Sequence, residues 1–247
     1  MGGGGRAGGL DAGRHRTGPQ VAGDGDDSRQ SGVRVRTRAR GRIRALTLAA
    51  ALVGWAFTAG LDQPWRRHPA LHAALVTGLA VLARARFGLR TPAATAGLRL
   101  GAAVGAAAAA GIASSTALPR VRTGMAGRDL PARRGHWLGV EIPLGTVWSE
   151  EVAFRGALST VAAAAFGPTG GRALQSVTFG LSHLPDARDT GEPIVGTVLV
   201  TSVAGWMFAL LAERSGSLLA PMMAHLAINE SGAVAALAVQ RYSRTRR

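Results

Sequence analysis

Three short polar motifs interrupt apolar stretches of this 247-residue chain. The first, Glu150–Arg155 with the sequence EEVAFR, lies inside an apolar stretch from about residue 137 to 166. The second is Phe179–His183 (FGLSH), and the third is His225–Asn229 (HLAIN). Ionisable groups inside a membrane helix are costly unless they are paired or face a wet cavity, so they indicate a functional site. The motifs therefore predict chemistry or transport within a membrane.

The first motif supplies two adjacent carboxylates and one cation. In an α-helix each residue turns by about 100°, so Glu151 and Arg155, four residues apart, share a face and can form an ion pair. Glu150 lies one step round, on the face of Phe154, and can project into a cavity. Spacing does not settle which glutamate is the base. Both could instead end a helix that stays outside the membrane.

Histidines and an asparagine complete the candidate chemistry. His183 could act as a general acid or base, or could be an interfacial residue at the end of its segment. His225 and Asn229 are four residues apart and present two hydrogen-bonding groups on one helix face, for an oxyanion or for a neighbouring helix. A carboxylate, a histidine and such a pair are the parts needed to activate water and stabilise an oxyanion in peptide hydrolysis.

Other functions use similar residues. Glu150, His183 and His225 could hold Zn²⁺ with one position open, although the sequence lacks the His-Glu-x-x-His helix of zinc proteases. A transporter would use buried acids as relays, but the sequence shows no internal repeat. A membrane-embedded immunity protein or scaffold would bind a peptide, lipid or protein without catalysis.

The elements that must position these motifs are apolar segments. They span approximately residues 43–61, 70–82, 93–118, 137–166, 173–184, 194–211 and 218–239. Alanine, leucine, valine and glycine carry most of the 47% hydrophobic content, which suits membrane helices that pack through small residues. A span takes about 20 residues, so the second and fifth segments are marginal. We predict an all-α, polytopic membrane bundle of six to eight transmembrane helices.

Composition divides the chain into three parts. Residues 1–42 are rich in glycine and arginine and poor in large apolar side chains, which predicts a disordered cytoplasmic arm. Residues 43–240 form the predicted membrane domain, with the catalytic core at about 137–240, and residues 241–247 form a basic tail. The first apolar segment begins too late for a cleavable signal peptide, so we expect it to be an uncleaved anchor.

The net charge of +15 rests on arginine alone, because the chain has no lysine. Arginines that flank apolar segments contact anionic lipid head groups and place the N-terminus in the cytoplasm. Neither the arginines of residues 120–134 nor those of the C-terminus would then face the cytoplasm if seven spans alternated, so either one marginal segment is not a full span or a longer one is two. Scarce aromatic residues argue against nucleic-acid binding. The bias to arginine, alanine and glycine is typical of a GC-rich bacterial genome, so we expect a multi-pass protein of a bacterial inner membrane.

In order and spacing, the three motifs resemble those of the CPBP family of intramembrane glutamic endopeptidases, which groups CAAX prenyl proteases with bacteriocin-processing and self-immunity proteins. The resemblance covers about residues 137–239 and implies a helical membrane bundle around a polar cavity. It implies that Glu150 acts as the general base together with His183, without a metal or other cofactor. It also implies that His225 and Asn229 form the oxyanion hole.

The same resemblance makes Glu151 and Arg155 a supporting ion pair and Phe179 a further supporting residue. Glu141, about half a turn out of phase with Glu150, and Glu230 lie outside the motifs and receive no role. The predicted function is metal-independent hydrolysis of a membrane-associated or leader peptide. A non-catalytic immunity or scaffold protein and a zinc-dependent membrane protease remain alternatives.

Overall fold

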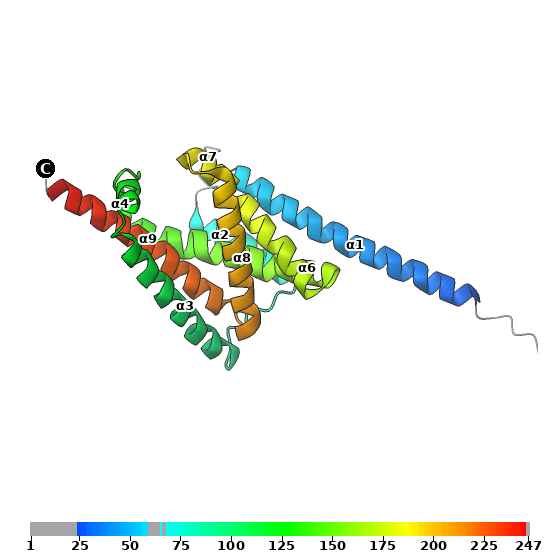
Figure 1. The fold of residues 1–247 in the computed structure, drawn as a ribbon. Helices are drawn as coiled ribbons and strands as arrows, with labels where there is room; N and C mark the ends of the chain where they lie inside the picture. The colour runs from blue at the N-terminus through cyan, green and yellow to red at the C-terminus, as the bar shows by residue number, and fades with distance from the viewer. Residues whose placement is uncertain (1–23, 59–64, 66–67, 246–247) are drawn as a thin grey trace, which may run out of the picture. The chain divides into compact units, whose positions relative to one another are not determined.

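The computed structural model describes residues 24–58, 65 and 68–245, with side chains from residue 36 onward. A boundary at residue 38 divides the chain into two compact units, and the described part of the first unit belongs to the first helix. Every regular element in the described ranges is helical, which confirms the all-α prediction there. The helices, shown in Figure 1, are α1 (Asp24–Phe57), α2 (Pro69–Leu82), α3 (Ala93–Ser115), α4 (Pro119–Ala126), α5 (Arg134–His136), η2 (Trp137–Trp148), η3 (Glu151–Leu158), α6 (Ser159–Ser182), α7 (Leu184–Thr190), α8 (Ile194–Ser215) and α9 (Leu219–Thr245).

Helix α1 begins inside the arm of residues 1–42 for which composition predicts disorder. It runs from residue 24 to residue 57 without a proline, and the arginine and alanine that are frequent in it favour helices. Low hydrophobicity limits the surface that a segment can bury, but it does not prevent local helix formation. The boundary at residue 42 therefore does not separate irregular from helical chain. Residues 1–23 of the predicted arm lie outside the described residues.

In the part of the chain that the structure describes, three helices are long and apolar enough to cross a membrane, namely α3, α8 and α9. Helix α2 is apolar but has only 14 residues, in line with its marginal length in the sequence. The predicted count of six to eight spans therefore stays a prediction.

The stretch that carries the first motif has unusually wide helical turns. Helices η2 and η3 have the i→i+5 hydrogen bonds of a π-helix, a form that is rare and concentrates at functional sites. Two residues, Ser149 and Glu150, join them. Trp148 fastens this stretch to α2 because its Nε1 donates a hydrogen bond of 3.0 Å to Thr77 Oγ1.

Helix α6 is divided where the sequence predicts a gap between two apolar segments. Gly167 has φ 77° and ψ 170°, and Pro168 follows it. Proline lacks an amide donor and clashes with the preceding turn, and glycine tolerates a positive φ. The chain therefore kinks here and continues as a helix to Ser182, immediately before His183.

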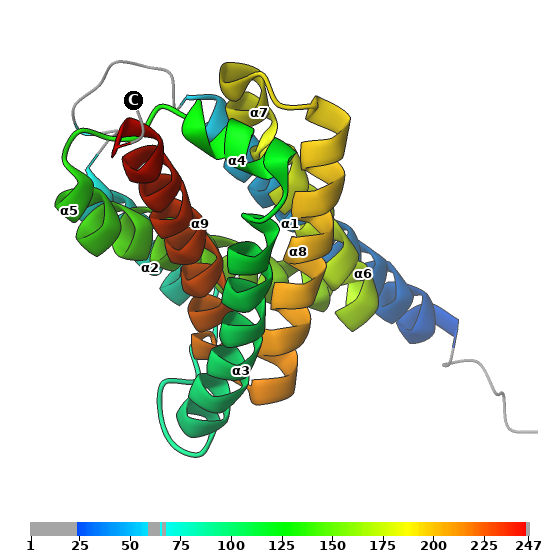
Figure 2. The same ribbon diagram turned by 60° about the vertical axis from the view of Figure 1, so that its left-hand side comes forward.

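Helices α3 and α9 pack closely in the same direction, as Figures 1 and 2 show. Gly97, Gly101 and Gly105 share one face of α3, and a Cβ on Gly101 would lie 2.5 Å from the carbonyl oxygen of Ala220. Only glycine permits this approach, which is common between membrane helices. At the far end of α9, Gln240 Nε2 donates to the carbonyl oxygens of Met125 at 3.2 Å and Arg128 at 2.7 Å.

The two hydrogen bonds of Gln240 bear on which side of the membrane the arginine-rich segments occupy. They place the arginine-rich residues 120–134 and the C-terminal end of α9 at the same end of the α3–α9 pair. Because α3 and α9 run in the same direction, both segments lie on one side of the pair, as alternation requires of segments that follow the third and the seventh of seven spans. With a cytoplasmic N-terminus, that alternation would place both segments outside the cytoplasm, against their arginine content. Which side faces the cytoplasm stays a prediction.

Helices α6 and α8 run antiparallel and hold the second motif in place. A Cβ on Gly180 would lie 2.5 Å from the carbonyl oxygen of Val198, so α8 approaches α6 directly at this level. Nearer the kink, Arg172 Nε donates to Glu213 Oε1 at 3.0 Å. Close packing at two levels fixes the rotation of α6, and with it the direction of the residues that end this helix.

Candidate active site

Glu151 lies at the centre of a fully buried charge cluster. Its side chain has no exposed surface, and neither has that of Arg155, whose Nη1 donates to Glu151 Oε1 at 3.1 Å. The ion pair predicted from their spacing is therefore present, in spite of the π-helical turns around it. The same oxygen lies 2.7 Å from His225 Nδ1, on α9. A buried charge is tolerable only with such partners.

Aromatic rings enclose the guanidinium of Arg155. Its Cζ lies 4.0 Å from the ring centre of Phe179, on α6, and 5.0 Å from that of Phe208, on α8. In the part of the chain that the structure describes, Nε and Nη2 of Arg155 have no hydrogen-bond partner. Cation–π contacts therefore take the place of hydrogen bonds on this side of the guanidinium. Phe179 packs against this guanidinium, and its supporting role stays a prediction.

His225 bonds to Glu151 on one side and stacks on an aromatic ring on the other. Phe208 stacks on it with ring centres 5.0 Å apart and planes 25° apart. A carboxylate oxygen only accepts, so Nδ1–H donates to Glu151 and Nε2 is left for other partners. Nε2 lies 3.9 Å from Glu150 Oε2. The four-residue spacing predicts that His225 and Asn229 share a helix face, but the bond of His225 Nδ1 to Glu151, 74 positions away, could not be predicted from spacing.

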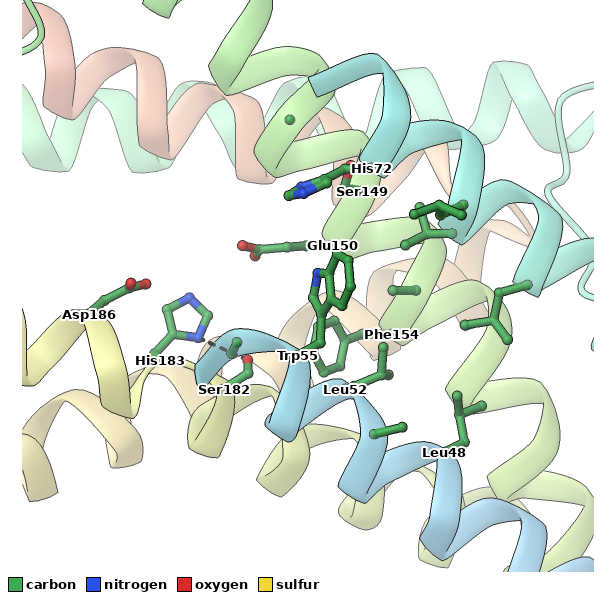
Figure 3. A pocket seen from close by; sticks show the side chains of 17 residues that line it. Leu48, Leu52, Trp55, His72, Ser149, Glu150, Phe154, Ser182, His183 and Asp186 are labelled. Carbon is green, nitrogen blue, oxygen red and sulfur yellow. Dashed lines mark hydrogen bonds between the residues drawn. The ribbon is translucent and has the colours of Figure 1, made fainter. Parts of the chain in front are cut away.

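Glu150, in contrast to Glu151, borders a cavity of about 420 Å³. Its side chain is 27% exposed, and among the described residues its Oε2 has no hydrogen-bond partner. Figure 3 shows the Glu150 carboxylate between His72 and His183 in the view, with Asp186 beyond His183. The opposite wall is apolar and comes mainly from α1 and α2, including Leu48, Leu52, Trp55, Leu75, Val76 and Leu79.

His183 is held in one orientation by its own helix. Its Nδ1 lies 2.8 Å from the carbonyl oxygen of Phe179, and the two rings meet edge to face with centres 4.7 Å apart. A carbonyl oxygen only accepts, so Nδ1 carries the proton in the neutral ring. Nε2 then keeps its lone pair and can accept a proton or a hydrogen bond from a group in the cavity.

The structure does not bring every predicted residue to the cavity. Asn229 is partly buried one turn beyond His225 on α9, and it does not line the cavity. Glu141 lies elsewhere, as its phase predicted, and its Oε1 is 2.9 Å from His136 Nδ1. Glu230 is partly buried, and no partner for its Oε1 occurs among the described residues.

Sequence reasoning missed two cavity residues, His72 and Asp186, and one residue of the buried cluster, Phe208. His72 is the only ionisable residue in the apolar segment 70–82, so the rule that singled out the first motif could have found it. Asp186 follows His183 by three positions. Although Asp186 is an exposed residue, desolvation of its carboxyl at the cavity edge raises its pKa, and His183 partly opposes this shift. Phe208 carries no sequence signal, because phenylalanine is ordinary in an apolar helix.

The described residues contain no group of three His, Asp or Glu side chains arranged to hold a metal ion. In the zinc site considered from sequence, His225 would have to bind through Nε2, because Nδ1 bonds to Glu151. Glu150, His183 and His225 as placed do not form a ligand set.

Apolar helices and a buried carboxylate–histidine cluster beside a cavity define a helical membrane protein with a candidate hydrolytic site. A family model matches part of the chain. Residues 134–230 match the family described as type II CAAX prenyl endopeptidase Rce1-like. This segment is therefore an Rce1-like type II CAAX prenyl endopeptidase domain, and the resemblance seen in the motifs is confirmed. Neither a curated protein nor a solved structure matches the chain.

The matched segment contains all three motifs but only part of the cavity. It starts at residue 134, whereas the apolar wall and His72 belong to α1 and α2. The acids of the cavity and His183 thus lie in the part that matches the family, whereas His72 and the apolar wall lie outside it.

Proposed function

We propose that this protein is an intramembrane endopeptidase that hydrolyses a peptide bond with water activated by Glu150, without a metal ion. The observation that carries the proposal is the difference between two adjacent acids. One oxygen of Glu151 is bound by both Arg155 and His225, and its side chain is fully buried. Glu150 borders the cavity and keeps an oxygen without a partner among the described residues.

In the proposed reaction, the Glu150 carboxylate takes a proton from a water molecule, whose oxygen attacks the carbonyl carbon of the peptide. His183 supports this step because its Nε2 can accept a hydrogen bond from the same water. As the C–N bond breaks, Glu150 returns the proton to the leaving amine. The carboxylate is regenerated, and one water is consumed for each bond cleaved.

The developing oxyanion needs hydrogen-bond donors. His225 suits this role because Glu151 holds its Nδ1 and directs its Nε2 toward Glu150. When both ring nitrogens carry protons, Nε2–H can donate to the oxyanion while Glu151 balances the charge. We assign Asn229 to the same role from the family motif, and substrate binding would have to bring it into reach.

The substrate is proposed to be a membrane-associated or leader peptide. The cavity wall opposite the acids is built from leucine, valine and tryptophan side chains, which favour an apolar peptide segment. Three helices that can cross a membrane would keep such a segment and the enzyme in the same bilayer. Cleavage would occur where the apolar wall meets the polar end of the cavity.

The test compares Glu150→Gln with wild type in lipid nanodiscs, using a library of apolar peptides and mass spectrometry of the products. We expect the variant to lose roughly 10²–10⁴ of the cleavage rate, the usual contribution of a general base. Glu141→Gln is the matched control, since it removes an acid from the same stretch but outside the cavity, and it should keep full activity. Cleavage by Glu150→Gln at the wild-type rate would sink the proposed mechanism.

A further inference from the structure

A second hollow lies away from the catalytic cavity, between α3 and α9. It has a volume of about 410 Å³ and is lined by small side chains, among them Ala109, Ala113 and Thr116 of α3 and Ser231, Val234 and Ala238 of α9. It shares no lining residue with the catalytic cavity. We call it the α3–α9 groove.

The groove continues the close contact between the two helices. Gly97, Gly101 and Gly105 recur every fourth residue on α3, and Ala109 and Ala113 follow at the same spacing. A Cβ on Gly105 would lie 2.8 Å from Ala227 Cβ, so the helices still touch at this level. Beyond it, the same face of α3 borders the groove. Small residues on both helices therefore leave an apolar channel where the close contact ends.

One end of the groove is strongly basic. Val234, Ala238 and Arg241 are spaced by four and three residues, so Arg241 continues the lining face of α9 just beyond the groove. On the other side, Thr116 is followed within a few residues by α4, which carries Arg120 and Arg122.

Helix α4 is tied to this end by the bonds from Gln240 to its last turn and to the residues that follow it. Figure 2 shows α4 at the end of α3, near the C-terminal part of α9. Arg120, Arg122 and Arg241 are exposed, and among the described residues none of them has a carboxylate in an ion pair. Three exposed arginines thus lie near this end of the groove, on α4 and α9.

We propose that the α3–α9 groove binds an anionic phospholipid, with an acyl chain along the small side chains and the phosphate at Arg120, Arg122 and Arg241. The apolar channel fits a hydrocarbon chain, and guanidinium groups form charge-assisted hydrogen bonds with phosphate oxygens. A zwitterionic phospholipid has the same chains but no net charge. Charge complementarity therefore selects the anionic lipid, which would join α3, α4 and α9 at one end of the bundle.

Native mass spectrometry of the detergent-purified full chain, with phosphatidylglycerol or phosphatidylcholine of identical chains, tests the proposal. We expect retention of one phosphatidylglycerol at concentrations where phosphatidylcholine is lost. The variant Arg120→Gln/Arg122→Gln/Arg241→Gln should bind phosphatidylglycerol roughly tenfold more weakly or worse, because each basic residue contributes to attraction for anionic lipid. Equal retention of the two lipids by wild type would overturn the proposal.

The matched control is Arg86→Gln/Arg90→Gln/Arg99→Gln, which removes three exposed arginines toward the opposite end of α3. This variant should bind phosphatidylglycerol like wild type. An equal loss of binding in this control would show that net charge alone determines the affinity, and it would overturn the proposed site. The variant Ala113→Leu/Ala238→Leu keeps every charge but fills the groove, and it should also lose the lipid. If water-soluble glycerophosphoglycerol competed as well as the intact lipid, the groove would have no part in binding.

Discussion

Glu150 and Glu151 are adjacent in the chain, yet they belong to two different regions. Around Glu151, an arginine, a histidine and aromatic rings form a buried cluster. Around Glu150, side chains from α1, α2, η2 and α6 leave a cavity with polar groups at one end. One step along a helix thus separates a fully buried, paired acid from an acid that borders a cavity. His225 connects the regions, since it bonds to Glu151 and turns its other nitrogen toward Glu150.

This difference predicts that substitutions around Glu151 lower the stability of the fold, whereas substitution of Glu150 lowers the cleavage rate. Arg155→Gln would leave Glu151 buried without its cation, which typically costs about 3–5 kcal/mol of folding free energy. Glu150→Gln should keep wild-type stability while losing cleavage. Thermal unfolding in detergent, followed by circular dichroism, measures the difference. The double variant Glu151→Gln/Arg155→Gln is the control and should recover part of the loss, because no unpaired charge remains.

A smaller loss of stability is expected when the ring of Phe208, which contacts both Arg155 and His225, is removed. Phe208→Leu keeps an apolar side chain but removes the stack on His225 and the face over Arg155. Loss of these contacts should cost roughly 1–3 kcal/mol of stability and lower the cleavage rate less than Glu150→Gln. Phe57→Leu, at the exposed end of α1, is the control and should change neither quantity. An unchanged melting temperature for Phe208→Leu would show that the ring does not support the cluster.

The smallest effect is predicted for metal removal. If Glu150 acts on water directly, incubation with 1,10-phenanthroline followed by buffer exchange should leave the cleavage rate unchanged. The measurement is the rate on one peptide before and after treatment, with and without added Zn²⁺. Loss of activity that Zn²⁺ restores would make Glu150 a metal ligand and would break the proposed division between the two acids.

The sequence was sufficient to predict those features of the site that depend on residues close together in the chain. It identified three polar motifs in apolar helices, the Glu151–Arg155 pair and the break between residues 166 and 173. Each of these depends on residues within a few positions of one another, where helical geometry limits the possible contacts. The family affiliation followed from the same motifs. The disorder predicted for residues 24–42 rested on composition alone, which does not weigh local helix propensity.

Tertiary packing decided what lies across from each motif. The bond from His225 to Glu151, the ring of Phe208 over Arg155 and the place of His72 in the cavity wall join residues on different helices. No periodicity along the chain encodes these distances, because they depend on how close two helices come and how each is rotated. Glycines allow α3 to come close to α9 and α6 to come close to α8.

The sequence by itself determined that this chain forms apolar helices carrying an acid pair, two histidines and an asparagine in the order of the CPBP motifs. Only the tertiary structure decided which of the two acids is locked and which borders the cavity. The physical reason is burial: Glu151 is fully buried with partners from α9 and from its own helix, whereas α1 and α2 leave a cavity beside Glu150.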